Sequence, residues 1–183
     1  MQKNNDISTA RAVLKSKSAA TITALTGAVL LPQLVHICAR LSGVGASLGE
    51  MLLPMHLPII LAALISGPYV GMIAGLLSPI ISCALTSMPA AAILPFMCIE
   101  LSGYGLIAGL LSKKNVPTLA KILTAQVGGR LVRILAMIVA PTLGIKANVS
   151  AYVTSLAQGL VGVAIQLVFI TLAIYALKKK RII

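Results

Sequence analysis

Residues 54–89 read PMHLPIILAALISGPYVGMIAGLLSPIISCALTSMP, and they contain two apolar runs, Ile59–Ile65 and Val70–Leu85. Proline or glycine bounds each run, and no Asp, Glu, Lys or Arg occurs from Leu57 to Ile99. A helix at the surface of a soluble domain carries charged residues along one face. The absence of such a face here indicates helices that lie within a membrane.

The composition of the whole chain supports the same class. The 183 residues are 58% hydrophobic and only 10% charged, and the mean hydropathy is +1.03. One crossing of the hydrocarbon core takes roughly 20 helical residues, so this length allows about six crossings with short loops. We therefore predict an all-α polytopic membrane protein with six transmembrane helices in one membrane domain, residues 19–177.

The predicted spans leave a basic segment, 1–18, before the membrane domain and a basic tail, 178–183, after it. The spans are expected at 19–39, 52–66, 69–85, 90–111, 119–140 and 149–177. Six crossings return the chain to its starting side, and Lys113 and Lys114 fall on that side too. Because basic residues mark the cytoplasmic side, both termini are predicted to be cytoplasmic. The net charge of +12 thus reports orientation in the membrane and not binding to nucleic acid.

No residues with the spacing of a catalytic site occur in the chain. It has no Ser-His-Asp arrangement, no pair of carboxylates and no phosphate-binding loop, so we expect neither an enzyme nor a bound cofactor. The three cysteines fall in or beside apolar runs without metal-ligand spacing and are expected to serve packing. A metal site of His36, His56 and Glu50 is conceivable, but its spacing matches no metal motif.

Charged residues within the predicted spans are the strongest functional signal, because burying them in a bilayer is costly. Glu100 is expected about 15 Å below the outer surface and Arg130 about 16 Å above the inner one, near the middle of a core of roughly 30 Å. Arg133 lies one turn further outward, and Gln158 has a similar depth. These residues could form the polar floor of an outward-facing pocket, or Glu100 and one arginine could form a structural pair. Two arginines against one glutamate leave a surplus positive charge.

A second group of candidate binding residues is expected at the outer rim of the bundle. Gln33, His36, His56 and Met88 all fall near the outer ends of predicted spans. The Gly/Ser-rich segment 42–51 joins the first two spans above them. A flexible loop in this place is a candidate gate for a ligand.

Small residues recur at a spacing of four in the first span, at Ala20, Ala24 and Ala28. This spacing makes a flat helix face that another helix can approach closely. The face could pack inside this chain, or it could bind a partner subunit. Gly71 and Gly75 form a second face of this kind in the third span.

The order of these motifs resembles the substrate-binding S component of energy-coupling factor (ECF) vitamin transporters. The resemblance covers about residues 19–175 and depends on order and spacing, since each motif alone is short. The matching motifs are Leu31-Pro32-Gln33-x-x-His36, the PMHLP at 54–58, Gly67-Pro68-Tyr69-x-Gly71-x-x-x-Gly75-x-x-Ser78-Pro79, Met88-Pro89, Glu100-x-x-x-Tyr104-Gly105 and Gly109-Leu110.

This resemblance implies a six-helix protein of the bacterial cell membrane that captures a water-soluble vitamin or precursor from outside. It also implies a transmembrane coupling subunit and two cytoplasmic ATPase subunits as partners, and release of the ligand when the S component topples in the membrane. The first-helix alanines are the expected contact with the coupling subunit, and the pocket is expected in the outer half.

The ligand is less closely defined than the class of protein. Aromatic residues make up 3% of the chain and tryptophan is absent, which disfavours a ligand that is a large flat ring. Pantothenate suits the surplus arginine best, and a pyridoxine- or hydroxymethylpyrimidine-like ligand, stacked on Tyr104 or Tyr152, follows closely. The alternative function is a self-sufficient secondary transporter or channel gated by Glu100 and Arg130. The scarcity of membrane carboxylates and the lack of an inverted repeat disfavour it.

Overall fold

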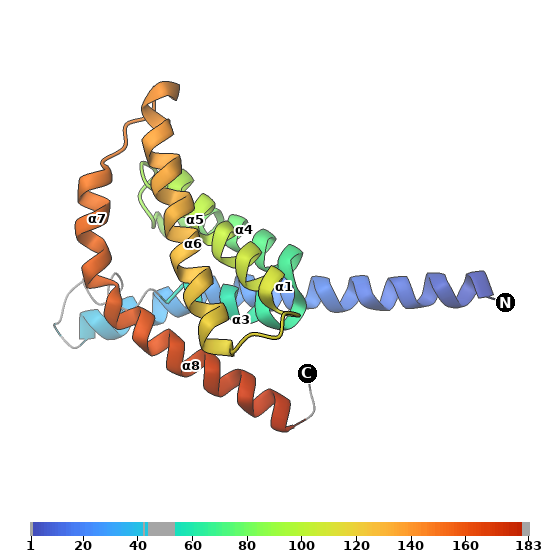
Figure 1. The fold of residues 1–183 in the computed structure, drawn as a ribbon. Helices are drawn as coiled ribbons and strands as arrows, with labels where there is room; N and C mark the ends of the chain where they lie inside the picture. The colour runs from blue at the N-terminus through green and yellow to red at the C-terminus, as the bar shows by residue number, and fades with distance from the viewer. Residues whose placement is uncertain (1, 42, 44–53, 181–183) are drawn as a thin grey trace.

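The computed structural model describes residues 2–41, 43 and 54–180, without the side chains of 2–15 and 158. This part of the chain is helical and contains no strand, which confirms the all-α prediction (Figure 1). The predicted gate at 42–51 lies outside the described residues except for Gly43. The helices, in chain order, are α1 (Gln2–Leu41), α3 (His56–Ser66), α4 (Pro68–Thr86), α5 (Leu94–Leu111), α6 (Thr118–Val139), the short 3₁₀ helix η1 (Ala140–Leu143), α7 (Val149–Gln158) and α8 (Leu160–Lys179).

Five helical segments in the described part are long and apolar enough to cross a membrane. They are Ser16–Leu41, Pro68–Thr86, Leu94–Leu111, Thr118–Leu143 and Leu160–Lys179. In the described part of the predicted second span, 54–66, the helix is α3, whose 11 residues are shorter than a crossing requires. At about 1.5 Å per residue, α3 covers roughly half of the hydrocarbon core. The structure thus supports a membrane protein with five long apolar helices, and the sixth crossing stays a prediction.

Helix α1 is much longer than the span predicted within it. Its 40 residues form one continuous helix that projects from the bundle at its N-terminal end (Figure 1). A helix of this length measures roughly 60 Å, about twice the hydrocarbon core. The predicted basic segment is therefore not a separate element but the extension of the first span.

The predicted sixth span consists of two helices, α7 and α8, and the chain turns between them at Gly159 (Figure 1). Glycine is a poor helix former because it has no side chain to restrict its backbone, so a long apolar run can break there. Tyr152 of α7 packs in a small apolar cluster with Phe96, Met137 and Ala140. In α8, Gln166 is bonded to Gln126 of α6, as described below.

Helices α4 and α5 pack backbone against backbone through glycines. A Cβ added at Gly105 would collide with the backbone of Gly71, and one added at Gly75 would collide with the carbonyl of Leu101. At Gly109 the added Cβ would meet Pro68. The prediction that Gly71 and Gly75 form a close-packing face is confirmed. Helix α5 is in this way held against α4 on one side and leaves its other sides for α3 and α6.

The alanine face of α1 packs inside this chain. Ala24 and Ala28 are 3% and 0% exposed and belong to the core that also contains Ile59 and Ile60 of α3. Ala20 is half-buried. Of the two roles that the spacing allows, internal packing is the one that this structure favours for Ala24 and Ala28. Contact with a partner through these two residues would require them to leave the core.

The tight α4–α5 contact predicts that Gly105→Ala is strongly destabilising. The new methyl group meets backbone atoms that cannot rotate away, so we expect a loss of about 1–3 kcal/mol in the free energy of unfolding. Gly128→Ala is the matched control, because its new Cβ would meet only the terminal Cδ1 atom of the Ile107 side chain. Unfolding in detergent micelles, followed by far-UV circular dichroism, measures both. Equal losses would contradict backbone-to-backbone packing.

Candidate functional site

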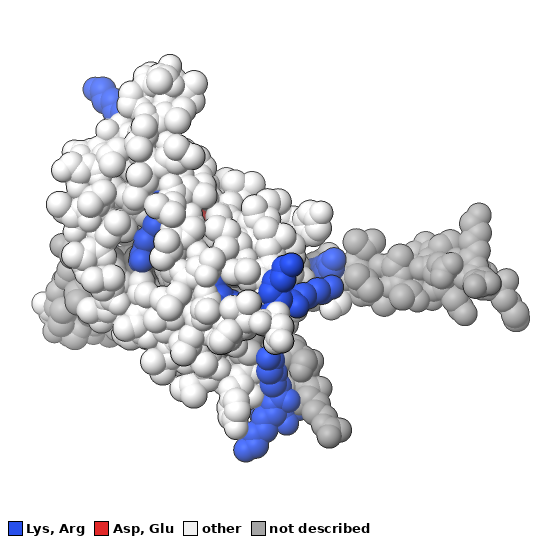
Figure 2. Space-filling view, viewed as in Figure 1, with Lys and Arg blue, Asp and Glu red and all other residues white. Residues whose placement is uncertain are grey.

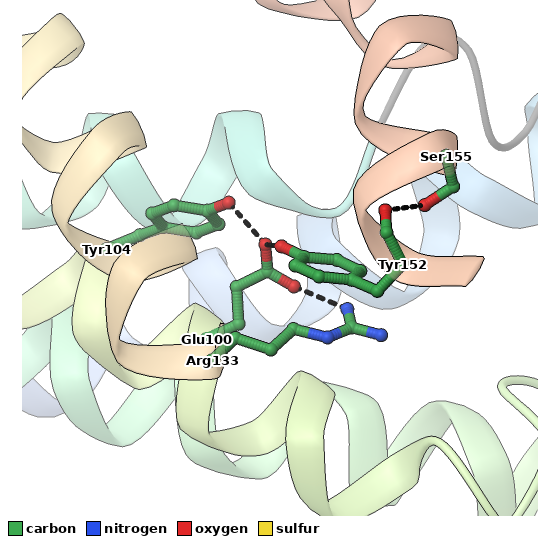
Figure 3. A network of polar contacts seen from close by, with 5 residues as sticks. All are labelled: Glu100, Tyr104, Arg133, Tyr152 and Ser155. Atoms are coloured by element: carbon green, nitrogen blue, oxygen red, sulfur yellow. Dashed lines mark hydrogen bonds and ion pairs between the residues drawn. The ribbon is translucent and has the colours of Figure 1, made fainter. Parts of the chain in front are cut away.

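The carboxylate of Glu100, on α5, is buried and accepts three hydrogen bonds (Figure 3). The Tyr104 hydroxyl donates to Oε1 at 2.6 Å, and the Tyr152 hydroxyl donates to the same oxygen at 2.7 Å. Arg133 Nη1 donates to Oε2 at 2.5 Å and forms an ion pair with it. The negative charge is thus compensated by one cation and two hydroxyl groups, as a buried charge requires.

This carboxylate joins three helices, because Tyr104 belongs to α5, Arg133 to α6 and Tyr152 to α7. The Arg133 guanidinium also lies over the Tyr152 ring, with Cζ 4.1 Å from the ring centroid, in a cation–π contact. His56 adds α3, since its ring centroid lies 4.9 Å from that of Tyr104. We call these five residues (His56, Glu100, Tyr104, Arg133 and Tyr152) the Glu100 cluster.

Gly129 on α6 makes room for the cluster. A Cβ at this position would collide with the ring of Tyr104 and would lie 2.9 Å from the carbonyl oxygen of Glu100. The absence of a side chain at Gly129 therefore lets the Tyr104 ring lie directly against α6. It fixes the ring at a distance from which its hydroxyl reaches the carboxylate.

Arg130, on α6 three residues before Arg133, is the uncommitted charge of this region. It is half-buried and has no hydrogen bond or ion pair with any described residue. Arg130 and Arg133 are three residues apart on one helix, so they occupy neighbouring positions on the surface of α6. Figure 2 shows basic side chains in a recess of the surface between the parts formed by α6 and α7. The predicted surplus of one positive charge over Glu100 is present among the described residues.

The residues predicted at the outer rim do not all reach this cluster. Gln33 Nε2 donates to Thr86 Oγ1 at 3.3 Å and joins α1 to the end of α4. The Thr86 hydroxyl also lies 3.4 Å from the carbonyl oxygen of Met88, whose side chain is exposed. His36 is half-buried on α1, one turn beyond Gln33. Of the predicted rim residues, His56 belongs to the Glu100 cluster, and the described contacts do not join Gln33, His36 or Met88 to it.

Of the nine predicted binding residues, the structure brings four into contact with one another, and a fifth, Arg130, lies one turn from Arg133 on α6. The four are His56, Glu100, Tyr104 and Arg133, and their role in binding stays a prediction. Gln158 is the last residue of α7, and its side chain lies outside the described part. Tyr152, predicted above only as an aromatic for a ligand, is a hydrogen-bond donor to Glu100 as well.

A second buried polar contact, not predicted above, links α6 to α8. Gln126 Nε2 donates to Gln166 Oε1 at 2.6 Å, and both residues are 1% exposed. Glutamines in an apolar span must find hydrogen-bond partners, and they commonly find each other across helices. The position of both glutamines within apolar runs was a signal that they need partners. It could not identify those partners, because depth in the membrane does not say which side of a helix faces a neighbour.

The chemistry open to this arrangement is recognition of an anion. Within the described ranges, no three of His, Cys, Asp and Glu come close enough together to hold a metal ion. The Glu100 carboxylate accepts from three donors, whereas the Arg130 guanidinium donates to none of the described residues. A guanidinium binds a carboxylate through two parallel hydrogen bonds.

Comparisons with protein-family profiles, curated proteins and solved structures found no match for this chain. The class that the fold defines is a helical protein with several helices long and apolar enough to span a membrane. Its distinguishing feature is one compensated carboxylate at the meeting point of four helices.

The ion pair predicts strong coupling between Glu100 and Arg133. Glu100→Gln leaves a buried guanidinium without its counter-charge, and Arg133→Gln leaves a buried carboxylate, so each should cost about 3–5 kcal/mol of stability. The double variant removes both charges and should lose much less than the sum of the single losses. Arg130→Gln is the control, expected to have little effect because Arg130 has no ion pair with the described residues. Additive losses in this double-mutant cycle, measured by unfolding in micelles, would refute the coupling.

Proposed function

We propose that this chain is the substrate-binding S component of an ECF-type importer in the bacterial cell membrane. It binds a water-soluble vitamin or precursor from outside, and separate subunits supply the energy. The motif order described above supports this class, as do the long apolar helices. The observation that carries the proposal is Arg130, which has no ion pair with the described residues and lies one helical turn from Arg133, the arginine that compensates Glu100.

The contacts support different tasks for the two arginines. Arg133 is held by Glu100 and by the Tyr152 ring, so it positions the cluster. Arg130 is the residue proposed to bind a ligand carboxylate. Pantothenate, a flexible carboxylate with hydroxyl groups, is the ligand that this charge favours. A pyridoxine- or hydroxymethylpyrimidine-like ligand would depend instead on the adjacent rings of His56 and Tyr104.

The distribution of acids supports dependence on a separate energy source. The chain has three acidic residues, Asp6, Glu50 and Glu100. Among the residues that the structure describes, Glu100 is the one that falls within a segment long and apolar enough to cross a membrane. Glu100 is itself bound to Arg133 and two tyrosines, so the described segments of this kind offer no free carboxylate to carry a proton. The proposed partners are accordingly a transmembrane coupling subunit and two cytoplasmic ATPases. Their contact with this chain is not placed on Ala24 and Ala28, which are buried.

The positions of the lysines support cytoplasmic termini. Lys113 and Lys114 follow α5, and Lys178–Lys180 end α8, whereas Lys146 lies beyond the opposite end of α6. Figure 2 shows basic side chains near the α5–α6 connection and near the end of α8. This asymmetry matches the positive-inside rule with that end in the cytoplasm.

A matched pair of ligands tests the role of Arg130. Pantothenate carries a carboxylate, and pantothenol carries an uncharged alcohol in its place. Arg130→Gln should weaken pantothenate binding by about 10- to 100-fold, since a hydrogen bond to a charged group contributes about 1.5–3 kcal/mol. The same variant should change pantothenol binding little. Isothermal titration calorimetry of the purified chain measures both.

A conservative variant is the control for this experiment. Arg130→Lys keeps the charge but loses the two-pronged geometry, so an intermediate loss is expected. Equal losses for pantothenate and pantothenol would refute a carboxylate contact at Arg130. Binding of pyridoxine without binding of pantothenate would overturn the ligand preference but keep the proposed class.

Reconstitution into liposomes separates the proposed class from the alternative. The chain alone should bind pantothenate but should not accumulate it inside the vesicles when a proton or sodium gradient is imposed. Dissipating the gradient with an ionophore is the control, and it should leave binding unchanged. Gradient-driven accumulation would refute the S-component assignment and support the self-sufficient transporter.

A further inference from the structure

One end of the helical bundle carries a group of exposed lysines that the proposed ligand site does not use. They lie at the ends of separate helices: Lys17 on α1, Lys113 and Lys114 after α5, and Lys178, Lys179 and Lys180 at the end of α8. The only acid from residue 54 to residue 180 is the buried Glu100, so no described carboxylate in that range neutralises them. Figure 2 shows the basic side chains of this region on the surface. We call these six residues the lysine end.

Two of the four tyrosines are exposed at the same end. Tyr69, in the first turn of α4, is 68% exposed, and Tyr175, near the end of α8, is 65% exposed. Tyr69 lies beside the last turns of α5, because Pro68 packs against Gly109. Exposed tyrosines at the ends of apolar helices are typical of the membrane interface, where the ring is buried in acyl chains and the hydroxyl reaches the headgroups.

The order of exposed side chains along these helices follows the layers of a bilayer. On α8, the exposed apolar residues Val168, Phe169 and Leu172 precede Tyr175, and the lysines come last. Leu110, just before Lys113, is exposed and apolar in the same way. An acidic protein surface would match the lysines alone, whereas a lipid also matches the apolar and tyrosine layers next to them.

We propose that the lysine end binds anionic phospholipids, with lysine ammonium groups on the phosphates and the two tyrosines at the level of the lipid glycerol. This role is independent of the vitamin site. A lysine close to an anionic bilayer surface strengthens association with the membrane about fivefold. The attraction decays over about one Debye length, and added salt shortens that length and so weakens the attraction. Several lysines acting together give a preference for anionic over zwitterionic lipid.

Titration of the purified full chain in detergent with single lipids tests the proposal. Phosphatidylglycerol should raise the thermal unfolding temperature more than phosphatidylcholine does, and 0.5 M salt should reduce the difference. Replacing Lys113, Lys114, Lys178, Lys179 and Lys180 together by glutamine should weaken phosphatidylglycerol binding by roughly tenfold or more. The control Lys146→Gln, at the opposite end, should leave it unchanged. Binding of pantothenate is a further control and should survive all these substitutions.

The remaining arms distinguish the sources of negative charge. Inorganic phosphate and polyglutamate are added in place of lipid at equal charge, and neither should reproduce the effect. If inorganic phosphate stabilises the chain as much as phosphatidylglycerol does, the ligand of the lysine end is a free anion and not a lipid. If polyglutamate does so, the ligand is an acidic protein surface. The proposal would also be overturned if phosphatidylglycerol and phosphatidylcholine raised the unfolding temperature equally, or if the five-lysine variant bound phosphatidylglycerol as well as the unmodified chain does.

Discussion

The ion pair between Glu100 and Arg133 is the interaction on which the arrangement of α5, α6 and α7 depends. A carboxylate in an apolar bundle loses several kcal/mol of hydration, and only good geometry with additional donors offsets this loss. Here Arg133, Tyr104 and Tyr152 supply those donors from three helices. The requirement explains why α7 lies against the bundle although the chain breaks at Gly159.

The glycines meet the steric requirement of the same arrangement. Gly105 and Gly109 let α5 approach α4, and Gly129 lets the Tyr104 ring approach α6. A protein in lipid gains little from hydrophobic association between helices, so close backbone packing and buried hydrogen bonds must hold the helices together. Arg130, one turn from Arg133 on α6, has no hydrogen bond or ion pair with the described residues. This combination of a compensated carboxylate and an uncommitted arginine is the basis of the proposed ligand site.

Apolar runs and depth estimates predicted a large part of this structure. The helices at 68–86, 94–111 and 118–139 lie within a few residues of their predicted spans. Depth arithmetic put Glu100 and Arg130 near the middle of the membrane and Arg133 one turn further outward, because helical rise converts sequence position into height. The observed partner of Glu100 is Arg133. Depth arithmetic could not choose between Arg130 and Arg133 as the partner of Glu100, since that choice depends on rotation about the helix axis.

The remaining differences have local physical causes. The break at Gly159 lies within a predicted span, 149–177, that contains no Asp, Glu, Lys or Arg, so the charge pattern gives no signal for it. The alanine spacing on α1 is the same for internal packing and for contact with a partner, and only the tertiary structure shows Ala24 and Ala28 in the core. The bond between Gln126 and Gln166 required knowledge that α8 crosses α6 at that height.

The most direct test of the central claim is mass spectrometry of small molecules that co-purify with the chain. If the region beside the Glu100 cluster is the binding site, the unmodified protein should retain one carboxylate-bearing compound in near-stoichiometric amount. The Arg130→Gln variant should lose that compound, whereas Lys146→Gln should keep it. Retention of the same compound at the same ratio by Arg130→Gln would contradict the account.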